Sequence, residues 1–228
     1  MSQSNQSRPQ RKEAVRVFAP EFNEAEIEFK DPDEIEEQGE ERAANYVLLP
    51  TGGRANRVLM CGSLTETTEV SEKIIRARLV DETGENFFVY AGQQYNQDEY
   101  GQLKRLDAPE HLMIIGKPST YTTDEGDTYV SIDPEEVIIT DQGTRERWAA
   151  ETADQTLDRI EAFEAGNAPY QEEAGAHYDY DLSELRAHIE NVVAELAGDN
   201  EDAEADNEES EAEPEPEEGD IDPEAAAA

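Results

Sequence analysis

The feature that most constrains the fold is a strand–turn–strand pattern over residues 75–92, with the sequence IRARLVDETGENFFVYAG. Asp-Glu-Thr-Gly at positions 81–84 is typical of a turn. Successive side chains of a strand point to opposite faces of a sheet. The first strand should therefore direct Ile75, Ala77 and Leu79 into a core and leave Arg76 and Arg78 outside.

The second strand of this hairpin carries the aromatic residues. If Phe87 and its alternate neighbours fill the core, Phe88 and Tyr90 lie on the outer face beside Arg76 and Arg78. Cations for phosphates and rings for stacked bases are the combination that a single-strand nucleic-acid site uses. The alternative is that Phe87 and Phe88 are both core residues and the arginines only solubilise the surface.

Short apolar or alternating runs separated by turn residues continue from Tyr46 to about Thr140 and predict strands. A polar segment with apolar residues at helical spacing, 95–106, predicts a short helix or helical turn between them. The order of strands and helix matches a five-stranded oligonucleotide-binding barrel, whose helix lies between strands three and four. The strands are expected at 46–49, 57–65, 73–80, 86–92, 111–121 and 128–140.

Further candidate binding residues lie near the turns of this barrel. Tyr121 and Tyr129 flank the turn Thr123–Asp127 and could close over a bound strand from the hairpin linking the last two strands. Lys117 and Arg57 could supply additional phosphate contacts, as could Arg54.

After the barrel, apolar residues recur at the spacing of an amphipathic helix. Thr144 is expected to cap a helix that ends near Gly166, and a second helix is expected to begin at Asp181. These stripes either fold back on the barrel or contact a partner, and the candidate partner-binding residues are Trp148, Leu157, Ile160, Leu185, Ile189 and Val192. The predicted organisation is a disordered N-terminus (1–11), an extension and linker (12–45), the barrel (46–141), a helical segment (142–197) and a disordered acidic tail (198–228). The fold class is mainly β with C-terminal α.

The charge of the chain is strongly negative throughout. It has 57 acidic and 18 basic residues and a net charge of −39. Residues 198–228 contain 15 of the acidic and none of the basic residues, which leaves −24 on residues 1–197. Such a surface suits a cytoplasm at molar salt, where the Debye length is about 3 Å and self-repulsion is largely screened. Counterion release weakens at that salt, so a nucleic-acid site would depend more on stacking.

Several classes of function receive no support. The sequence has no P-loop, Gly-x-Ser-x-Gly or His-Glu-x-x-His motif, so we expect no catalysis, cofactor or small-molecule substrate. One cysteine, Cys61, excludes an internal disulfide and a multi-cysteine metal site. No apolar stretch is long enough to span a membrane and the polar start lacks a signal-peptide pattern, so a cytoplasmic protein is expected.

Five phrases, in this order along the chain, resemble haloarchaeal replication protein A family proteins. More narrowly, they are similar to the small associated subunit that accompanies the larger replication protein A chain. They cover residues 12–22 (KEAVRVFAPEF), 56–66 (NRVLMCGSLTE), 87–93 (FFVYAGQ), 116–121 (GKPSTY) and 145–148 (RERW).

This resemblance implies an oligonucleotide-binding barrel that binds single-stranded DNA in replication and repair, alongside the larger subunit. It implies a groove at Arg76, Arg78, Phe88 and Tyr90, and helices after the barrel that join subunits. A second hypothesis remains open, in which the chain is an assembly or regulatory subunit whose barrel binds protein. In that case the acidic tail could act as a DNA mimic.

Overall fold

The computed structural model describes residues 11–211, with side chains from 11 to 198. It divides into two units, residues 1–193 and 194–228, and the described part of the second is helical. The predictions for residues 1–10 and for 212–228 of the acidic tail lie outside the described residues.

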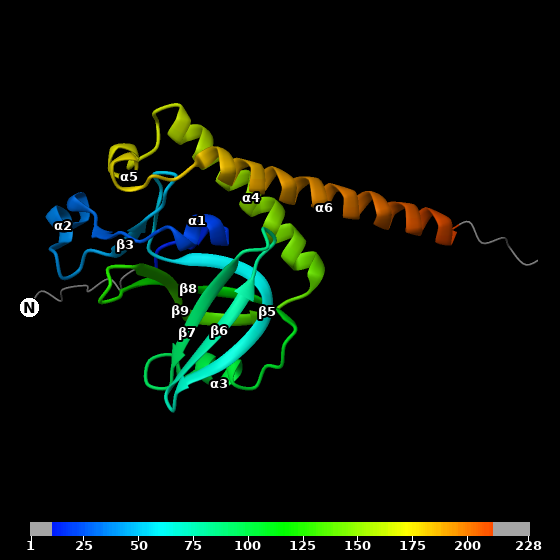
Figure 1. Ribbon diagram of the computed structural model, residues 1–228, viewed down its shortest axis with the longest axis horizontal. Coiled ribbons are helices and arrows are strands. Elements are labelled where there is room, and N and C mark those ends of the chain that lie inside the picture. The colour runs from blue at the N-terminus through cyan, green and yellow to red at the C-terminus, as the bar shows by residue number, and fades with distance from the viewer. Residues whose placement is uncertain (1–10, 212–228) are drawn as a thin grey trace, which may run out of the picture. The chain divides into compact units, whose positions relative to one another are not determined.

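Five strands with one inserted helix form a closed barrel (Figure 1). These are β5 (Val58–Ser71), β6 (Ile74–Val80), β7 (Asn86–Gly92), α3 (Gln97–Leu103), β8 (Glu110–Thr122) and β9 (Thr128–Ile139). β5 pairs with both β6 and β8, β8 pairs with β9, and a parallel contact between Val89 of β7 and Ile132 of β9 completes the ring. The predicted fold class, a five-stranded barrel followed by helices, is confirmed.

β5 can serve two neighbours because it bends near Gly62. Ser63, the next residue, is opposite His111 of β8 and also opposite Val80 of β6. A Cβ at Gly62 would lie 2.7 Å from the Val80 carbonyl oxygen and 2.9 Å from Cε1 of Phe87. The backbones of β5 and β6 therefore approach more closely than any side chain would allow.

The predicted alternation of the hairpin is confirmed. Ile75, Ala77 and Leu79 of β6 are at most 2% exposed, and the alternate residues Phe87, Val89 and Ala91 of β7 are fully buried. Together with Leu112, Ile114 and Ile132 from β8 and β9, they fill the barrel interior. The residues of β6 and β7 that alternate with these buried ones therefore point to the outer face.

The strand predicted at 46–49 lies outside the barrel. As β3 (Asn45–Leu48) it joins β2 (Glu28–Lys30) and β4 (Arg54–Ala55) in a separate three-stranded sheet. The turn after it returns the chain to β4, with the Leu49 N–H donating to the Gly53 carbonyl and Gly52 at a φ of 74°. The sheet reaches the barrel through Glu28, whose Oε1 accepts hydrogen bonds from the backbone N–H and Oγ1 of Thr120 on β8.

The N-terminal segment packs on the same barrel. β1 (Val15–Arg16) adds to β5 in parallel, and α1 (Ala19–Asn23) follows. Phe18 is fully buried with its ring centroid 5.2 Å from that of Trp148. The acidic part expected to be a linker instead forms α2 (Pro32–Gln38), because Asp31 caps its first turn by accepting from the Asp33 N–H.

Three helices follow the barrel. α4 (Gln142–Glu164) begins earlier than predicted, because Asp141 and not Thr144 is the N-cap and accepts from the Thr144 N–H at 2.7 Å. α5 (Gln171–His177) was not predicted, whereas α6 (Leu182–Glu211) begins after Asp181 as expected. α6 extends to Glu211, past the predicted end at 197.

The apolar stripes of α4 and α6 are covered by the chain's own residues. Trp148 donates from Nε1 to the Leu59 carbonyl of β5 at 3.1 Å, and Arg186 of α6 forms an ion pair with Glu164 of α4. Of the candidate partner-binding residues, Leu157 is half-buried and the other five, Trp148, Ile160, Leu185, Ile189 and Val192, are at most 3% exposed. Their role at a partner interface stays a prediction.

A buried carboxylate joins the hairpin turn to α1. Asp81, 2% exposed, accepts hydrogen bonds from the Ala19 N–H at 2.5 Å and from the Thr83 N–H at 2.9 Å. Burial raises the pKa of Asp81 to about 6, from an ordinary value of 3.8. Between these values the folded chain holds a proton that the unfolded chain has released, so stability from this group falls as pH rises.

We therefore expect the unfolding free energy of Asp81→Asn to rise relative to that of the unaltered chain as pH rises from about 4 to about 6. Asparagine keeps an oxygen for the Ala19 N–H but removes the charge. Urea denaturation of both proteins across this range, at constant salt, measures the difference in unfolding free energy. A difference in unfolding free energy that does not change with pH would contradict the raised pKa of Asp81.

Candidate nucleic-acid groove

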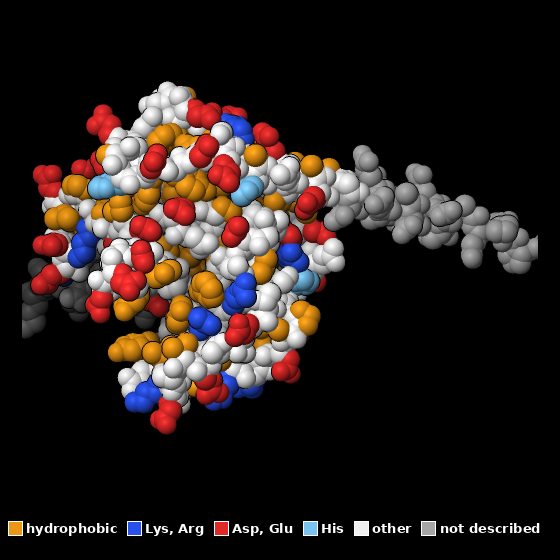
Figure 2. Space-filling view, in the orientation of Figure 1, with side chains coloured by type: hydrophobic (Ala, Val, Ile, Leu, Met, Phe, Trp, Pro, Cys, Tyr) orange, Lys and Arg blue, Asp and Glu red, His pale blue; other side chains and the backbone are white. Residues whose placement is uncertain are grey.

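The outer face of the β6–β7 hairpin carries the predicted cations and rings side by side. Arg76 is directly opposite Tyr90, and Arg78 is opposite Phe88. The Arg76 guanidinium lies 5.5 Å from the centroid of the Phe88 ring, and Arg78 donates from Nε to Oδ1 of Asn86. Figure 2 shows hydrophobic and basic side chains next to one another over this part of the barrel, among acidic ones. The predicted juxtaposition is confirmed.

A groove of about 620 Å³ opens beside this face. Its walls come from the start of β6, the end of β7 with the loop that follows, and the middle of the β8–β9 pair. Tyr90 and Tyr95 offer rings to it, and Lys73 and Lys117 offer ammonium groups. The lining residues are 73–74, 90–96, Lys117, Asp133 and Glu135.

The β8–β9 hairpin extends the same face beyond the groove. Lys117 is opposite Asp133, Ser119 is opposite Ser131, and Tyr121 is opposite Tyr129. Alternate residues of a strand share a face, so the tyrosine pair follows the groove residues along the hairpin. Tyr121 and Tyr129 are 69% and 61% exposed, and no core contact explains these rings. Both rings are thus exposed beside the Thr123–Asp127 turn, and their role in closing over a bound strand stays a prediction.

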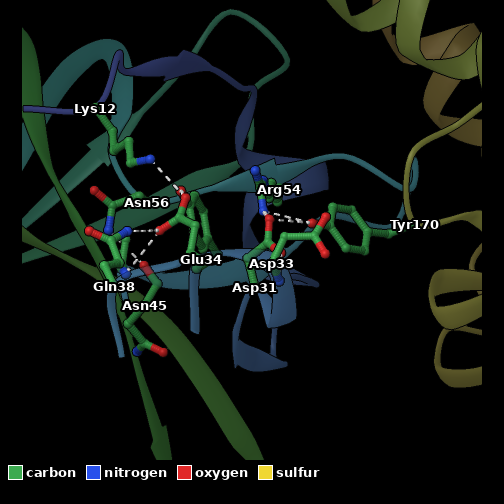
Figure 3. A network of polar contacts seen from close by, with 11 residues as sticks. Lys12, Asp31, Asp33, Glu34, Gln38, Asn45, Arg54, Asn56 and Tyr170 are labelled. Carbon is green, nitrogen blue, oxygen red and sulfur yellow. Dashed lines mark hydrogen bonds and ion pairs between the residues drawn. The ribbon is translucent and has the colours of Figure 1, made fainter. Parts of the chain in front are cut away.

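Two of the arginines considered for phosphate contact are engaged elsewhere. Arg57 is 7% exposed and forms an ion pair with Glu135. Arg54 forms an ion pair with Asp31 and lies 4.3 Å from the centroid of Tyr46, within the polar network of Figure 3. Arg54 links β4 to Asp31 at the start of α2, and Arg57 links the start of β5 to Glu135 of β9. Neither arginine lines the groove, although Glu135 does.

The cations that line the groove or lie on the outer face of β6 beside it are not engaged in this way. Lys73, Arg76, Arg78 and Lys117 form no ion pair with any other described residue. Each is exposed or half-buried. They are therefore available to phosphates in a way that Arg54 and Arg57 are not.

Sequence reasoning missed Tyr95, Lys73 and Asp133 as groove residues. Tyr95 was expected on a helix face, but α3 begins only at Gln97 and Tyr95 is 88% exposed in the turn before it. The turn is fixed by Asn96, whose Nδ2 donates to the Pro134 carbonyl of β9 at 2.7 Å. The long separation of residues 96 and 134 left no local signal for this contact.

The described residues give little support to a metal site, a reactive thiol or a membrane-spanning helix. Within residues 11–211 there is no group of three or more His, Cys, Asp or Glu side chains placed to hold a metal ion. Cys61 is buried, and burial raises the pKa of its thiol to about 12. None of the described helices has the length and apolar character needed to cross a membrane.

Neither a protein-family model nor a curated protein matches the sequence. Among solved structures, a chain of the S. pombe Stn1–Ten1 complex is similar over 66% of this chain and 96% of its own length, with 9% identity and a TM-score of 0.52. The chain has an oligonucleotide-binding fold. The mitochondrial single-stranded DNA-binding protein Rim1 of S. cerevisiae matches 37% of this chain and 91% of its own, with 12% identity and a TM-score of 0.31. OBody NL8, in complex with hen egg-white lysozyme, matches 38% and 94%, with 16% identity and a TM-score of 0.33.

Proposed function

We propose that this chain is a non-catalytic single-stranded-DNA-binding protein whose strand crosses the outer face of β6 and β7. The observation that carries the proposal is the pairing of Arg76 with Tyr90 and of Arg78 with Phe88, next to an open groove. Bases stack on the two rings, and the arginines contact the phosphates between them. The strand continues along the groove toward Tyr121 and Tyr129.

We further propose that it acts in replication and repair as the small subunit of a replication protein A complex, in the cytoplasm, alongside the larger subunit. The five sequence phrases support this assignment, since three of them, 56–66, 87–93 and 116–121, fall on barrel strands. The similar S. pombe structure is of a complex of two proteins, which supports a role alongside a partner chain.

The charge of the chain predicts an unusual dependence on salt. Binding to single strands weakens with a slope of about −0.7 in log K per log salt for each neutralised phosphate. Four cations on or beside the groove form no ion pair with a described residue, and they set a limit of about −3 on this slope. Screening of the −39 net charge works in the opposite direction. Binding should therefore persist at salt concentrations that dissociate a basic protein from DNA.

The test is fluorescence anisotropy of a labelled single strand of mixed cytosine and thymine, titrated with the whole chain from about 0.2 to about 2 M KCl. We expect saturable binding, a slope shallower than about −3, and no comparable binding of the same sequence as a duplex. Circular dichroism in each buffer confirms that the chain is folded. A folded chain that binds no single strand would overturn the proposal and favour a barrel that binds a protein partner.

A further inference from the structure

One carboxylate in the groove is not used by the described part of the fold. Glu135 is paired with Arg57, but the side chain of Asp133 forms no hydrogen bond or ion pair with another described residue. Asp133 is on β9 opposite Lys117, and both line the groove. Partial desolvation raises the pKa of Asp133, although nearby Lys117 lowers it. The groove thus presents a hydrogen-bond acceptor that is available to a ligand.

The register of the barrel places this acceptor beside a stacking ring. Val89 of β7 and Ile132 of β9 are parallel partners and are both fully buried. The next residue on each strand, Tyr90 and Asp133, therefore points to the outer face, on strands about 4.8 Å apart. A base stacked on Tyr90 would present its hydrogen-bonding edge to the neighbouring strand, where Asp133 lies.

A carboxylate suits a base better than a phosphate. It repels phosphate, so it weakens a site built only for the DNA backbone. It accepts well from the N4 amino group of cytosine, whereas thymine carries O4, itself an acceptor, at that position and offers only its N3–H as a donor. The two bases otherwise have the same ring size, so stacking on Tyr90 separates them little.

We propose that Asp133 is a specificity-determining residue that makes the groove prefer cytosine over thymine at the base stacked on Tyr90. This inference rests on the proposed function and adds a base preference to it. A contact of this kind contributes about 1–3 kcal/mol of discrimination, which is about 5-fold to 150-fold in affinity.

The test compares oligodeoxycytidine with oligodeoxythymidine of equal length, titrated into the whole chain and into Asp133→Asn. We expect the unaltered chain to bind the cytidine strand at least about fivefold more tightly. The carboxamide introduced by Asp133→Asn can donate as well as accept, so the ratio should fall close to one, chiefly through tighter binding of thymidine. Glu136→Gln is the matched control, because it removes one exposed charge from the same strand outside the groove lining.

Each outcome decides between distinct explanations. If Asp133→Asn raises both affinities equally and leaves their ratio unchanged, as expected for Glu136→Gln, Asp133 acts only as a charge and the base preference is overturned. If the folded, unaltered chain binds neither strand, the proposed function fails and this inference fails with it. A ratio that changes only in Asp133→Asn supports the assignment.

Discussion

Replacing Phe88 and Tyr90 together by alanine is expected to abolish binding of single-stranded DNA at protein concentrations that saturate the unaltered chain. Stacking contributes about 1–3 kcal/mol per base. Two lost platforms therefore correspond to about 30-fold up to more than 10⁴-fold in affinity. Both rings are half-buried on the outer face, while the core is filled by their neighbours Phe87 and Val89. The variant should therefore remain folded.

The measurement is an anisotropy titration at molar salt, where phosphate contacts contribute least. Ile139→Ala is the control, since this residue of β9 is 53% exposed and does not line the groove. A second comparison is Tyr121→Ala/Tyr129→Ala, which should weaken binding only of strands long enough to reach the hairpin. Equal affinity of Phe88→Ala/Tyr90→Ala and the Ile139→Ala control would rule out a stacking face on β6 and β7.

The largest expected loss of stability comes from Arg159→Ala. Glu21 of α1 is fully buried, and its carboxylate accepts from Arg159 Nη2 at 2.6 Å and from Thr51 Oγ1 at 2.5 Å. Removing one partner of a buried ion pair leaves an uncompensated charge and costs about 3–5 kcal/mol. Because the pair is buried, molar salt should reduce this loss little.

Arg186→Ala is the matched control, because Arg186 pairs with Glu164, whose side chain is 54% exposed. Exposed pairs contribute about 0–1 kcal/mol. Denaturant unfolding of both variants at low and at molar salt gives the comparison. Equal destabilisation by the two substitutions would show that Glu21 does not depend on Arg159 for its charge compensation.

The sequence predicts the parts of this fold that follow from local periodicity. Alternation of apolar side chains placed Ile75 and Phe87 inside the barrel and Arg76 and Tyr90 outside it, and the register confirms this. The same reasoning could not show where the barrel begins. A short apolar run such as 46–49 pairs equally well with several strands, and here a tight Gly-Gly turn commits it to β4.

The candidate site was predictable only to the same extent. Rings and cations on one hairpin could be found from spacing, because their partners are close in the chain. The ion pair of Arg57 with Glu135 and the contact of Asn96 with Pro134 join distant strands, so nothing in the sequence removed Arg57 from the site or added Tyr95 to it. These contacts form only when the barrel closes, and closure brings together strands that are far apart in the sequence.

The contact between Glu28 and Thr120 lies on an open edge of the barrel sheet. β5 pairs with β8 only as far as Gly116, so the outer edge of β8 beyond that residue has no neighbouring strand within the described part of the chain. Exposed edges of this kind invite pairing between molecules, and proteins protect them with charged side chains. Glu28 occupies the Thr120 N–H and places a carboxylate on this edge. We therefore expect the hairpin that extends the groove to pair less readily with a strand of a second molecule than it would without this carboxylate.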